Sequence, residues 1–349
     1  MKPDRKAGIV LAMVLILALL LSTAIITFTR RAIVDKMIAT NRNATAQAEA
    51  LARGGVQLAM ALVLEDVLLD AESDSKTVIG DTLGDGWAKV DSKQFVTDYG
   101  STLHLMIRDT GSRLNLNALV DQTKESENPD QTQAEEFLVT FLGKIIDEIP
   151  LPPGDKFYDS RELARNLIDY VDPNEERTGG RGSEDDYYQR QSPPYRSANR
   201  PLLGVEELRM IEGFDAAIVE AMTPYVTVYP LVSDQGININ TAPPHVLTAM
   251  YHGSSGDRRL ASPDAAQRLL RERESGRIIC DESSTAPDQC LPVGDFIDGS
   301  LYPPVQLPAR ATTFEIVSVA TVDEVTRQLE VVIDRTRPIS PRLLRWRYR

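Results

Sequence analysis

Residues 6–28 read KAGIVLAMVLILALLLSTAIITF, and this stretch decides how the rest of the chain is arranged. From Ile9 to Phe28 it contains no charged side chain. A helix of about 20 apolar residues is long enough to cross the hydrocarbon core of a bilayer. We therefore predict one membrane-spanning helix here. A cleaved secretory signal is the alternative, but the apolar run is longer than the usual core of such a signal.

Positive charges stand on both sides of the apolar run. They are Lys2, Arg5 and Lys6 before it and Arg30, Arg31 and Lys36 after it. Because an excess of Lys and Arg marks the cytoplasmic flank of a span, this even distribution does not set the orientation. The shortness of the leader favours an N-terminus in the cytoplasm and a body on the other side of the membrane.

The helical pattern continues past the membrane. Apolar residues recur at helical intervals from Ala32 to about Leu69, and no proline interrupts them. The sequence therefore predicts one long helix over residues 9–70. Gly54 and Gly55 interrupt the pattern, and we expect a bend or a close contact at this point.

Strand patterns occur on both sides of a long middle segment. Residues 101–108 (STLHLMIR) alternate between apolar and polar, and residues 312–322 and 326–333 alternate as a hairpin. Residues 345–348 (RWRY) predict an edge strand, whose arginines protect it from pairing with other chains. Residues 70–93 are polar and predict a loop, with a short strand at Trp87–Val90.

The middle segment is mainly helical. Amphipathic or capped patterns predict helices over residues 131–149, 160–171, 204–212, 215–222, 243–251 and 263–275. Two similar strings, Leu114-Asn115-Leu116-Asn117-Ala118 and Ile237-Asn238-Ile239-Asn240-Thr241-Ala242, each lead from an extended segment into a helix, with asparagine available as the cap. The fold class is α+β, a long N-terminal helix plus an antiparallel sheet, with a large mainly helical domain inserted.

Charge and cysteine content limit the possible partners. The 349-residue chain has 51 acidic and 38 basic residues, a formal charge of −13, which argues against general attraction to nucleic acid or anionic lipid. Its two cysteines, Cys280 and Cys290, lie in a polar stretch that predicts a loop. Two thiols alone make a poor zinc site. In an oxidising compartment we expect them to close a small disulfide loop.

A dense acidic segment runs from Asp172 to Asp186. Its carboxylates are Asp172, Glu175, Glu176, Glu184, Asp185 and Asp186. Carboxylate oxygens on a glycine-rich loop are ligands that calcium prefers. An EF-hand is excluded, because Arg177 replaces the turn glycine and Ser183 stands where the closing glutamate belongs. The alternative is a solvated acidic loop paired with Arg177 and Arg181.

Enzymatic chemistry has little support in the sequence. The only histidines are His104, His245 and His252, and none lies in a recognisable nucleophile or metal motif. There is no phosphate-binding loop and no dinucleotide fingerprint. We therefore predict no enzyme activity, with an anchored hydrolase as the alternative that these absences disfavour.

A DNA-binding role is the other alternative. Residues 206–215 (EELRMIEGFD) predict helix, glycine hairpin and helix, an arrangement typical of helix-hairpin-helix DNA binders. Here Asp215 replaces an expected second glycine and Glu212 lies beside it, and both would repel a phosphate. We expect no nucleic-acid partner, and keep a DNA-uptake protein or type IV pilus tip protein as the alternative function.

The leader resembles that of the type IV pilin and pseudopilin superfamily. Lys6-Ala7-Gly8 stands directly before the apolar run at Ile9, and in that superfamily a prepilin peptidase cuts after such a glycine. Most members carry glutamate as the fifth mature residue, and here that position is Met13. A carboxylate in the bilayer needs a partner, so its absence fits a subunit with no neighbour above it, at a filament tip.

An ordered set of strings resembles the K-type minor pseudopilin family of type II secretion. These are Arg113-Leu114-Asn115-Leu116-Asn117, Leu167-Ile168-Asp169-Tyr170-Val171-Asp172-Pro173, Glu184-Asp185-Asp186-Tyr187-Tyr188, Pro194-Tyr195, Asn199-Arg200-Pro201, Glu207-Leu208-Arg209 with Gly213, and Asn238-Ile239-Asn240-Thr241-Ala242. The strings extend over most of the chain.

The resemblance implies a pilin-like body at the tip of the type II secretion pseudopilus. It implies assembly with I-type and J-type minor pseudopilins and with the major pseudopilin, and contact with the inner-membrane assembly platform. It also implies a single pass through the bacterial inner membrane, with the body in the periplasm. It also implies calcium in the helical domain, for which Asp172, Glu184, Asp185 and Asp186 are the first candidates, with Glu175 and Glu176 next.

The resulting division of the chain has five parts. Residues 1–8 are a cytoplasmic leader peptide, and 9–70 the membrane-spanning and periplasmic helix. Residues 71–118 begin the pilin-like sheet domain, 119–311 form the inserted helical domain, and 312–349 supply the C-terminal strands that complete the sheet.

Overall fold

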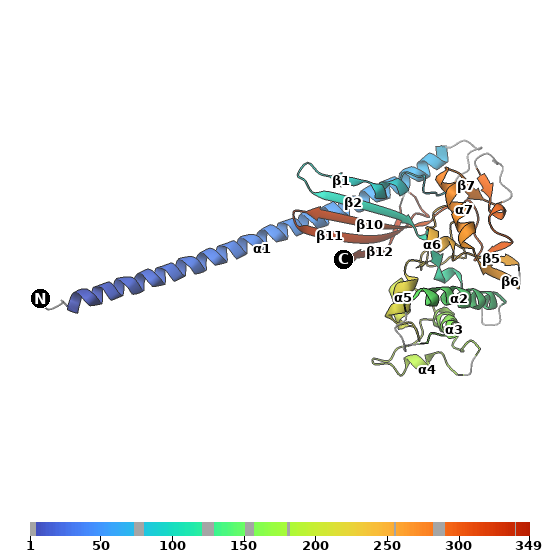
Figure 1. Ribbon diagram of the computed structural model, residues 1–349, viewed down its shortest axis with the longest axis horizontal. Helices are drawn as coiled ribbons and strands as arrows, with labels where there is room; N and C mark the ends of the chain where they lie inside the picture. The colour runs from blue at the N-terminus through green and yellow to red at the C-terminus, as the bar shows by residue number, and fades with distance from the viewer. Residues whose placement is uncertain are drawn as a thin grey trace.

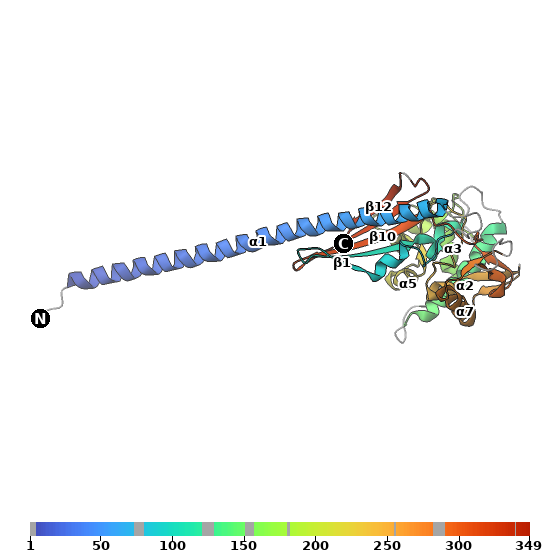
Figure 2. The ribbon, with the colours of Figure 1, turned by 90° about the horizontal axis from the view of Figure 1, so that it is seen from above.

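The computed structural model describes residues 5–72, 80–120, 129–150, 157–179, 182–254, 256–281, 290–338 and 340–349. Its longest element is α1 (Arg5–Glu72), one unbroken helix of 68 residues. The N-terminal part of α1 extends away from the body, and its C-terminal part lies along a sheet (Figures 1 and 2). Within the described ranges, α1 is the one helix long and apolar enough to cross a membrane. The predicted long helix is confirmed.

Five antiparallel strands form the sheet beside α1, in the order β1-β2-β10-β11-β12. They are β1 (Gln94–Val96), β2 (Thr102–Asp109), β10 (Thr313–Val322), β11 (Val325–Asp334) and β12 (Arg342–Tyr348). The long hairpin β10–β11 follows the alternation in the sequence, because each strand turns one face toward α1. β2 pairs with β10 across about 200 residues, so the chain leaves the sheet after β2 and returns to it at β10.

Small side chains let α1 approach the sheet closely. Ala52, Val56, Ala59 and Val63 of α1 are buried in one cluster with inward-facing residues of β2, β10 and β11. A Cβ atom on Gly55 would collide with Ser318 and with Leu105, so this glycine marks a close contact between α1 and the sheet. The helix is continuous through this glycine.

One predicted strand is wrong. Residues 87–90 form no strand; a 3-10 helix, η1 (Ala88–Ser92), begins after Trp87. Trp87 is 1% exposed, and its ring meets that of Phe314 edge-to-face with centroids 5.1 Å apart. The indole fills the core at the sheet's β1 side, and this tertiary contact overrides the local strand propensity.

The residues between β2 and β10 form a second body with a core of its own. Its helical elements are η2 (Thr110–Ser112), η3 (Leu116–Ala118), α2 (Pro129–Glu148), α3 (Ser160–Val171), α4 (Asp185–Tyr188), η4 (Val205–Met210), α5 (Ala216–Met222), α6 (Pro244–Leu247), α7 (Pro263–Glu274) and η5 (Val293–Asp295). Its strands are β3 (Leu114–Asn115), β4 (Val226–Thr227), β5 (Tyr251–Ser254), β6 (Asp257–Leu260), β7 (Ile278–Cys280), β8 (Cys290–Pro292) and β9 (Ser300–Tyr302). The α+β class with a mainly helical insertion is confirmed; the domain boundaries at residues 118 and 311 stay a prediction.

Two predicted helices differ from the structure. The helix expected over residues 243–251 is the single turn α6, because Tyr251 begins strand β5. The helix expected over 204–212 is the 3-10 helix η4. The three small sheets of the inserted body, β3–β4, β6–β5–β9 and β7–β8, were not predicted, because strands of two to four residues show too little alternation to be recognised.

Buried polar groups join the two bodies. Asp109, at the end of β2, accepts hydrogen bonds from Asn238 Nδ2 at 2.9 Å, Thr241 Oγ1 at 2.7 Å and Gly111 N at 2.7 Å. Arg335, just after β11, donates to Asp81 and, at 2.9 Å, to Asp66 of α1. The sheet, the end of α1 and the inserted body are therefore linked at one place by directional contacts.

Candidate metal centre in the inserted body

Helix α3 positions the first two carboxylates of the centre. Asp159 caps its N-terminus by accepting hydrogen bonds from the backbone N–H groups of Arg161 and Glu162. Asp172 is its C-terminal cap, where Pro173 ends the helix. Asp169 and Asp172 are three residues apart, so they lie on the same face, and both are buried, at 5% and 0% exposure.

The third carboxylate comes from the segment before α4. Glu184 precedes α4 and is 2% exposed. One carboxylate oxygen from each of Asp169, Asp172 and Glu184 lies within 4.8 Å of the other two. Figure 1 shows α3 and α4 at the side of the inserted body away from α1.

Glu184 is in an unfavourable environment for a bare anion. Neither of its carboxylate oxygens has a hydrogen-bond partner among the described residues. Burial, followed by the negative charges of Asp172 and Asp169, raises the pKa of Glu184 to about 9. Burial also raises the pKa of Asp169. A divalent cation would stabilise these carboxylates in their charged form.

The donor set fits calcium in its chemistry. All three groups offer oxygen atoms, and no described cysteine or histidine is among them. Asp169 Oδ1 accepts a hydrogen bond from Thr178 N at 2.9 Å, and Asn174 Nδ2 donates to Asp172 Oδ2 at 2.8 Å, so the loop that follows α3 orients both groups. Glu184 would supply a further oxygen ligand from the other side of the loop.

The structure brings together only part of the predicted ligand set. Asp172 and Glu184 meet, whereas Glu175, Glu176 and Asp186 are exposed and lie outside the cluster. Asp185 is half-buried and accepts hydrogen bonds from Ser197 N at 2.9 Å and Ser197 Oγ at 3.0 Å. It anchors the segment after α4 without joining the carboxylate cluster.

Sequence reasoning missed Asp169. Its position inside an amphipathic helix separates it from the acidic loop in sequence, and its three-residue spacing from Asp172 is the signal that indicates a shared face. The predicted arginine pairing is also different. Arg177 contacts Glu212 instead of the cluster, and Arg181 lies outside the described residues.

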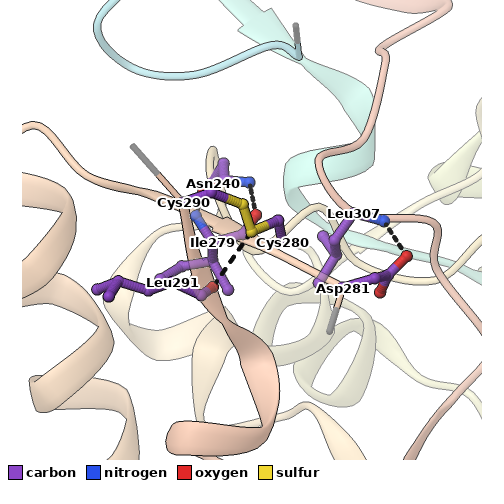
Figure 3. Close-up of a disulfide and its surroundings, with 7 residues drawn as sticks. All are labelled: Asn240, Ile279, Cys280, Asp281, Cys290, Leu291 and Leu307. Atoms are coloured by element: carbon purple, nitrogen blue, oxygen red, sulfur yellow. Dashed lines mark hydrogen bonds between the residues drawn. A yellow bond between two sulfur atoms is a disulfide. The ribbon is translucent and has the colours of Figure 1, made fainter. Parts of the chain in front are cut away.

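The two cysteines close a loop on the other side of the inserted body. Cys280 ends β7 and Cys290 begins β8, and they are joined in a disulfide with Cα atoms 5.9 Å apart. Figure 3 shows Asn240 beside this disulfide. Its side-chain amide is hydrogen-bonded to the backbone of Ile279. Both cysteines are buried, at 1% and 2% exposure.

The predicted processing site lies at the start of α1. Gly8 and Ile9 fall within the helix as it begins at Arg5, and the Ile9 side chain is 63% exposed. Met13 is 68% exposed, in the middle of the apolar segment. The exposed apolar surface here is suited to hydrocarbon and not to water.

Two family models match the inserted body. Both are described as "Type II secretion system (T2SS), protein K", and they cover residues 112–231 and 237–279. The first match includes the whole candidate metal centre. The second begins at the asparagine string of residues 237–242.

Relatives with the same description were found in several bacteria. Type II secretion system protein K of Klebsiella pneumoniae is 31% identical over 241 residues, which cover 69% of this chain and 68% of that protein. The Pseudomonas aeruginosa protein is 33% identical over 210 residues, 60% of this chain and 57% of that protein. The Aeromonas hydrophila protein is 28% identical, and the match covers 79% of this chain and 78% of the relative.

The fold is also found in a solved structure. A chain in the crystal structure of the GspK-GspI-GspJ complex from the type II secretion system of enterotoxigenic Escherichia coli aligns with a TM-score of 0.62 and 21% identity. The alignment covers 89% of this chain and 99% of that one. Because the two family models match and the Klebsiella pneumoniae protein is 31% identical over 68% of its length, the chain belongs to the type II secretion system protein K family.

Proposed function

We propose that this chain is the minor pseudopilin at the tip of the type II secretion pseudopilus. It initiates pseudopilus assembly with other minor pseudopilins and supports the export of folded proteins across the outer membrane. The observation that carries the proposal is the unbroken α1, which joins an apolar membrane segment directly to a sheet and a wide inserted body. The role is mechanical and not catalytic.

The structure suits the transmission of force along α1. A continuous helix does not hinge between the membrane and the body. Its Ala and Val side chains are buried against the sheet, and Arg335 links Asp66 of α1 to Asp81. Displacement of α1 along its axis would therefore move both bodies together.

The membrane segment supports a place at the tip. Met13 stands where related subunits carry glutamate, so this helix has no carboxylate with which to pair the N-terminal amine of a subunit above it. Prepilin peptidase would remove residues 1–8 in the cytoplasm. The processed subunit would remain in the bacterial inner membrane as a single pass, with its body in the periplasm.

The proposed partners follow from the relatives. The complex to which the fold is similar contains GspK, GspI and GspJ, which supports I-type and J-type minor pseudopilins as neighbours of this chain. The major pseudopilin and the inner-membrane assembly platform would act below this group. Assembly below this group requires contacts on its membrane-facing side. Its outer end would be too wide for further subunits to add beyond it.

We also propose that the centre formed by Asp169, Asp172 and Glu184 binds calcium. The two uncompensated oxygens of the buried Glu184 support this proposal. The ion would connect the end of α3 to the segment before α4, two regions 12 or more residues apart in the chain. It would therefore order the acidic loop instead of taking part in chemistry.

The geometry of the predicted hairpin counts against the DNA-binding alternative. Gly213 has a positive φ of +87°, and a Cβ atom there would lie 2.7 Å from Leu163 Cδ2 of α3. The carbonyl of Glu212 accepts a hydrogen bond from Asn166 Nδ2 at 3.1 Å. The hairpin is thus packed against α3, which leaves little room for a phosphate at its turn.

Deletion of the gene in its own organism tests the proposal. Exoproteins should accumulate in the periplasm of the deletion strain, and expression of the wild-type chain should restore their release. DNA uptake should be the same in both strains. Normal secretion together with lost DNA uptake would contradict the proposal and support the DNA-uptake alternative.

A further inference from the structure

A pocket lies in the inserted body beside the small sheet β6–β5–β9. Its volume is about 750 Å³. Most of its wall is apolar, and the side chains that form this wall include Leu119, Val120, Leu231, Val232, Tyr302 and Pro304. Figure 1 shows β5 and β6 at the end of the body farthest from the N-terminus of α1. A pocket of this size and character can hold a short stretch of peptide or a small ligand.

One positively charged side chain reaches the pocket among the described residues that line it, and this is Arg258 of β6. Arg258 and Ser300 both oppose Gly253 of β5, so these three positions form a row on one face of the small sheet. Tyr302 of β9 lies on the same face, since it opposes Tyr251, two residues from the glycine. Because Gly253 has no side chain, Arg258 can extend across β5 toward Tyr302. Its guanidinium lies 5.3 Å from the centre of the Tyr302 ring.

The guanidinium is held in place, but its hydrogen bonds are incomplete. Arg258 Nη1 donates to Gln133 Oε1 of α2 at 2.7 Å, and the ring of Tyr302 supports the group by a cation–π contact. A guanidinium carries five N–H donors. The Nε atom of Arg258 is buried and has no hydrogen-bond partner among the described residues. A buried donor without an acceptor costs free energy, so an acceptor bound in the pocket would stabilise it.

The guanidinium also lacks a counter-ion. No described carboxylate forms an ion pair with Arg258, although the chain has a formal charge of −13. Asp234 lines the same pocket, but it is exposed and accepts a hydrogen bond from Gln235 at 2.9 Å. The adjacent Arg259 points to the opposite face of β6, where it pairs with Asp298. The unpaired positive charge therefore belongs to the pocket, and an anion would complete it.

We infer that this pocket binds a carboxylate carried by an extended peptide, with Arg258 as its anchor. The Nε edge of a guanidinium can donate two parallel hydrogen bonds to a carboxylate. The apolar wall accommodates apolar residues on either side of the acidic one. The edge strand β9 borders the pocket and pairs on one side with β5, so its other side can add an extended strand through backbone hydrogen bonds.

The peptide is a segment of an exoprotein. This part of the inference rests on the proposed function, in which exoproteins are exported past the tip. The pocket lies at the end of the body that is farthest from the membrane segment, which is where an exoprotein would approach.

Fluorine NMR of a small peptide tests the chemistry of the pocket. The probe is a tripeptide of glutamate between two leucines, with an N-terminal trifluoroacetyl group and a C-terminal amide. On addition of the full-length chain in detergent, its signal should shift and broaden. The matched peptide with glutamine in place of glutamate should bind about 10-fold more weakly, because it cannot form the charge-assisted hydrogen bonds. Equal affinities of the two peptides would contradict the inference.

Variants of the chain assign the binding to Arg258. Arg258→Gln should weaken binding of the glutamate peptide by about 10-fold and leave the glutamine peptide unchanged. Arg259→Gln is the matched control and should bind like the wild type. Val232→Glu is a second variant that does not disturb the core, since Val232 is 82% exposed at the pocket. Its added negative charge should also weaken binding of the glutamate peptide. Thermal unfolding verifies that each variant is folded, and an unchanged preference for glutamate in Arg258→Gln would overturn the inference.

Secretion by the deletion strain tests the source of the peptide. The strain that expresses Arg258→Gln should release exoproteins several-fold more slowly than the strain that expresses Arg259→Gln. If the glutamate peptide binds but both strains release exoproteins at the same rate, an exoprotein is not the occupant and the inference is wrong. If the peptide does not bind and the wild-type chain restores secretion, the inference is wrong and the proposed function stands. If the wild-type chain does not restore secretion, the proposed function fails, and the exoprotein fails with it as the source of the peptide.

Discussion

Asn117 and Asn240 hold distant segments of the chain in the same way. Asn117 accepts from Leu202 N at 2.8 Å and donates to Leu202 O at 3.0 Å, and Asn240 accepts from Ile279 N and donates to Ile279 O, both at 2.8 Å. The inserted body therefore contains the same clamp twice. The segment before Leu202 carries the acidic cluster, and the residue after Ile279 is Cys280 of the disulfide. One clamped region is thus associated with the candidate metal centre and the other with a covalent bridge.

Replacing Asn117 with alanine should lower the free energy of unfolding by about 3 kcal/mol, because it leaves both backbone groups of Leu202 and the carbonyl of Val228 buried without their partner. Urea denaturation followed by far-UV circular dichroism measures the loss. Asn43→Ala is the matched control: Asn43 is exposed on α1, and its replacement should change stability by less than about 0.5 kcal/mol. Equal losses of unfolding free energy in both variants would refute the claim that the hydrogen bonds of Asn117 stabilise the fold.

Replacing Glu184 with glutamine should abolish the response to calcium. In the wild type, calcium should raise the midpoint of thermal unfolding, because it binds the folded centre and not the unfolded chain. Glu184→Gln keeps the shape of the side chain but removes its charge, so the midpoint should no longer rise. Asp186→Ala is the control, since Asp186 is exposed and outside the cluster, and it should respond like the wild type. A response retained in Glu184→Gln would exclude this residue as a ligand.

Removing the disulfide with Cys280→Ser and Cys290→Ser should cost about 3 kcal/mol of stability, the loop-closure estimate for a short loop. The two residues are 10 positions apart, and both are buried. Urea denaturation of the wild type without and with reductant should show a loss of stability equal to that of the double variant. If reductant changes the wild type but leaves the double variant unchanged, the effect belongs to this bridge.

Stability should fall in acid partly through Glu206. Partial burial raises the pKa of Glu206, but the hydrogen bond from Arg345 and the charges of Arg345 and Arg347 lower it more, so that the pKa falls from 4.5 to about 2. The ionised form is therefore favoured in the folded state. The contribution of the ionised Glu206 carboxylate to the free energy of unfolding is complete above pH 4.5. It is lost as the pH falls toward 2, where the folded protein binds the proton. Unfolding curves of Glu206→Gln should depend less on pH across this window, and an unchanged dependence would contradict the assignment.

Replacing Gly8 with aspartate should block removal of the leader. A small residue lets an extended backbone enter the peptidase, and a charged side chain at this position would not fit. Immunoblotting should show the unprocessed chain, and exoproteins should remain in the periplasm. Ala7→Ser, a small change one residue earlier, should be processed normally. Normal processing of the Gly8 variant would remove the basis for the predicted cleavage site.

Local patterns account for the elements that the sequence predicted correctly. Helix α1 could be recognised because a continuous apolar run is followed by apolar residues at helical intervals, and α3 because its cap Asp159 and its buried stripe agree. The hairpin β10–β11 is recognisable since its strands adjoin in sequence and alternate over ten residues each. Trp87 shows where local patterns fail. The residues around it predict a strand, but Trp87 packs against Phe314 and a 3-10 helix follows it.

The sequence by itself determined the membrane segment, the long helix, the sheet strands that flank the insertion and the acidic composition of the loop, because each depends on neighbouring residues. Only the tertiary structure decided which carboxylates meet. Asp169 and Glu184 are 15 positions apart and are brought together by the return of the chain after α3, while Glu175 and Glu176 remain in solvent. Contacts of this kind depend on how the elements pack, and no local period encodes them.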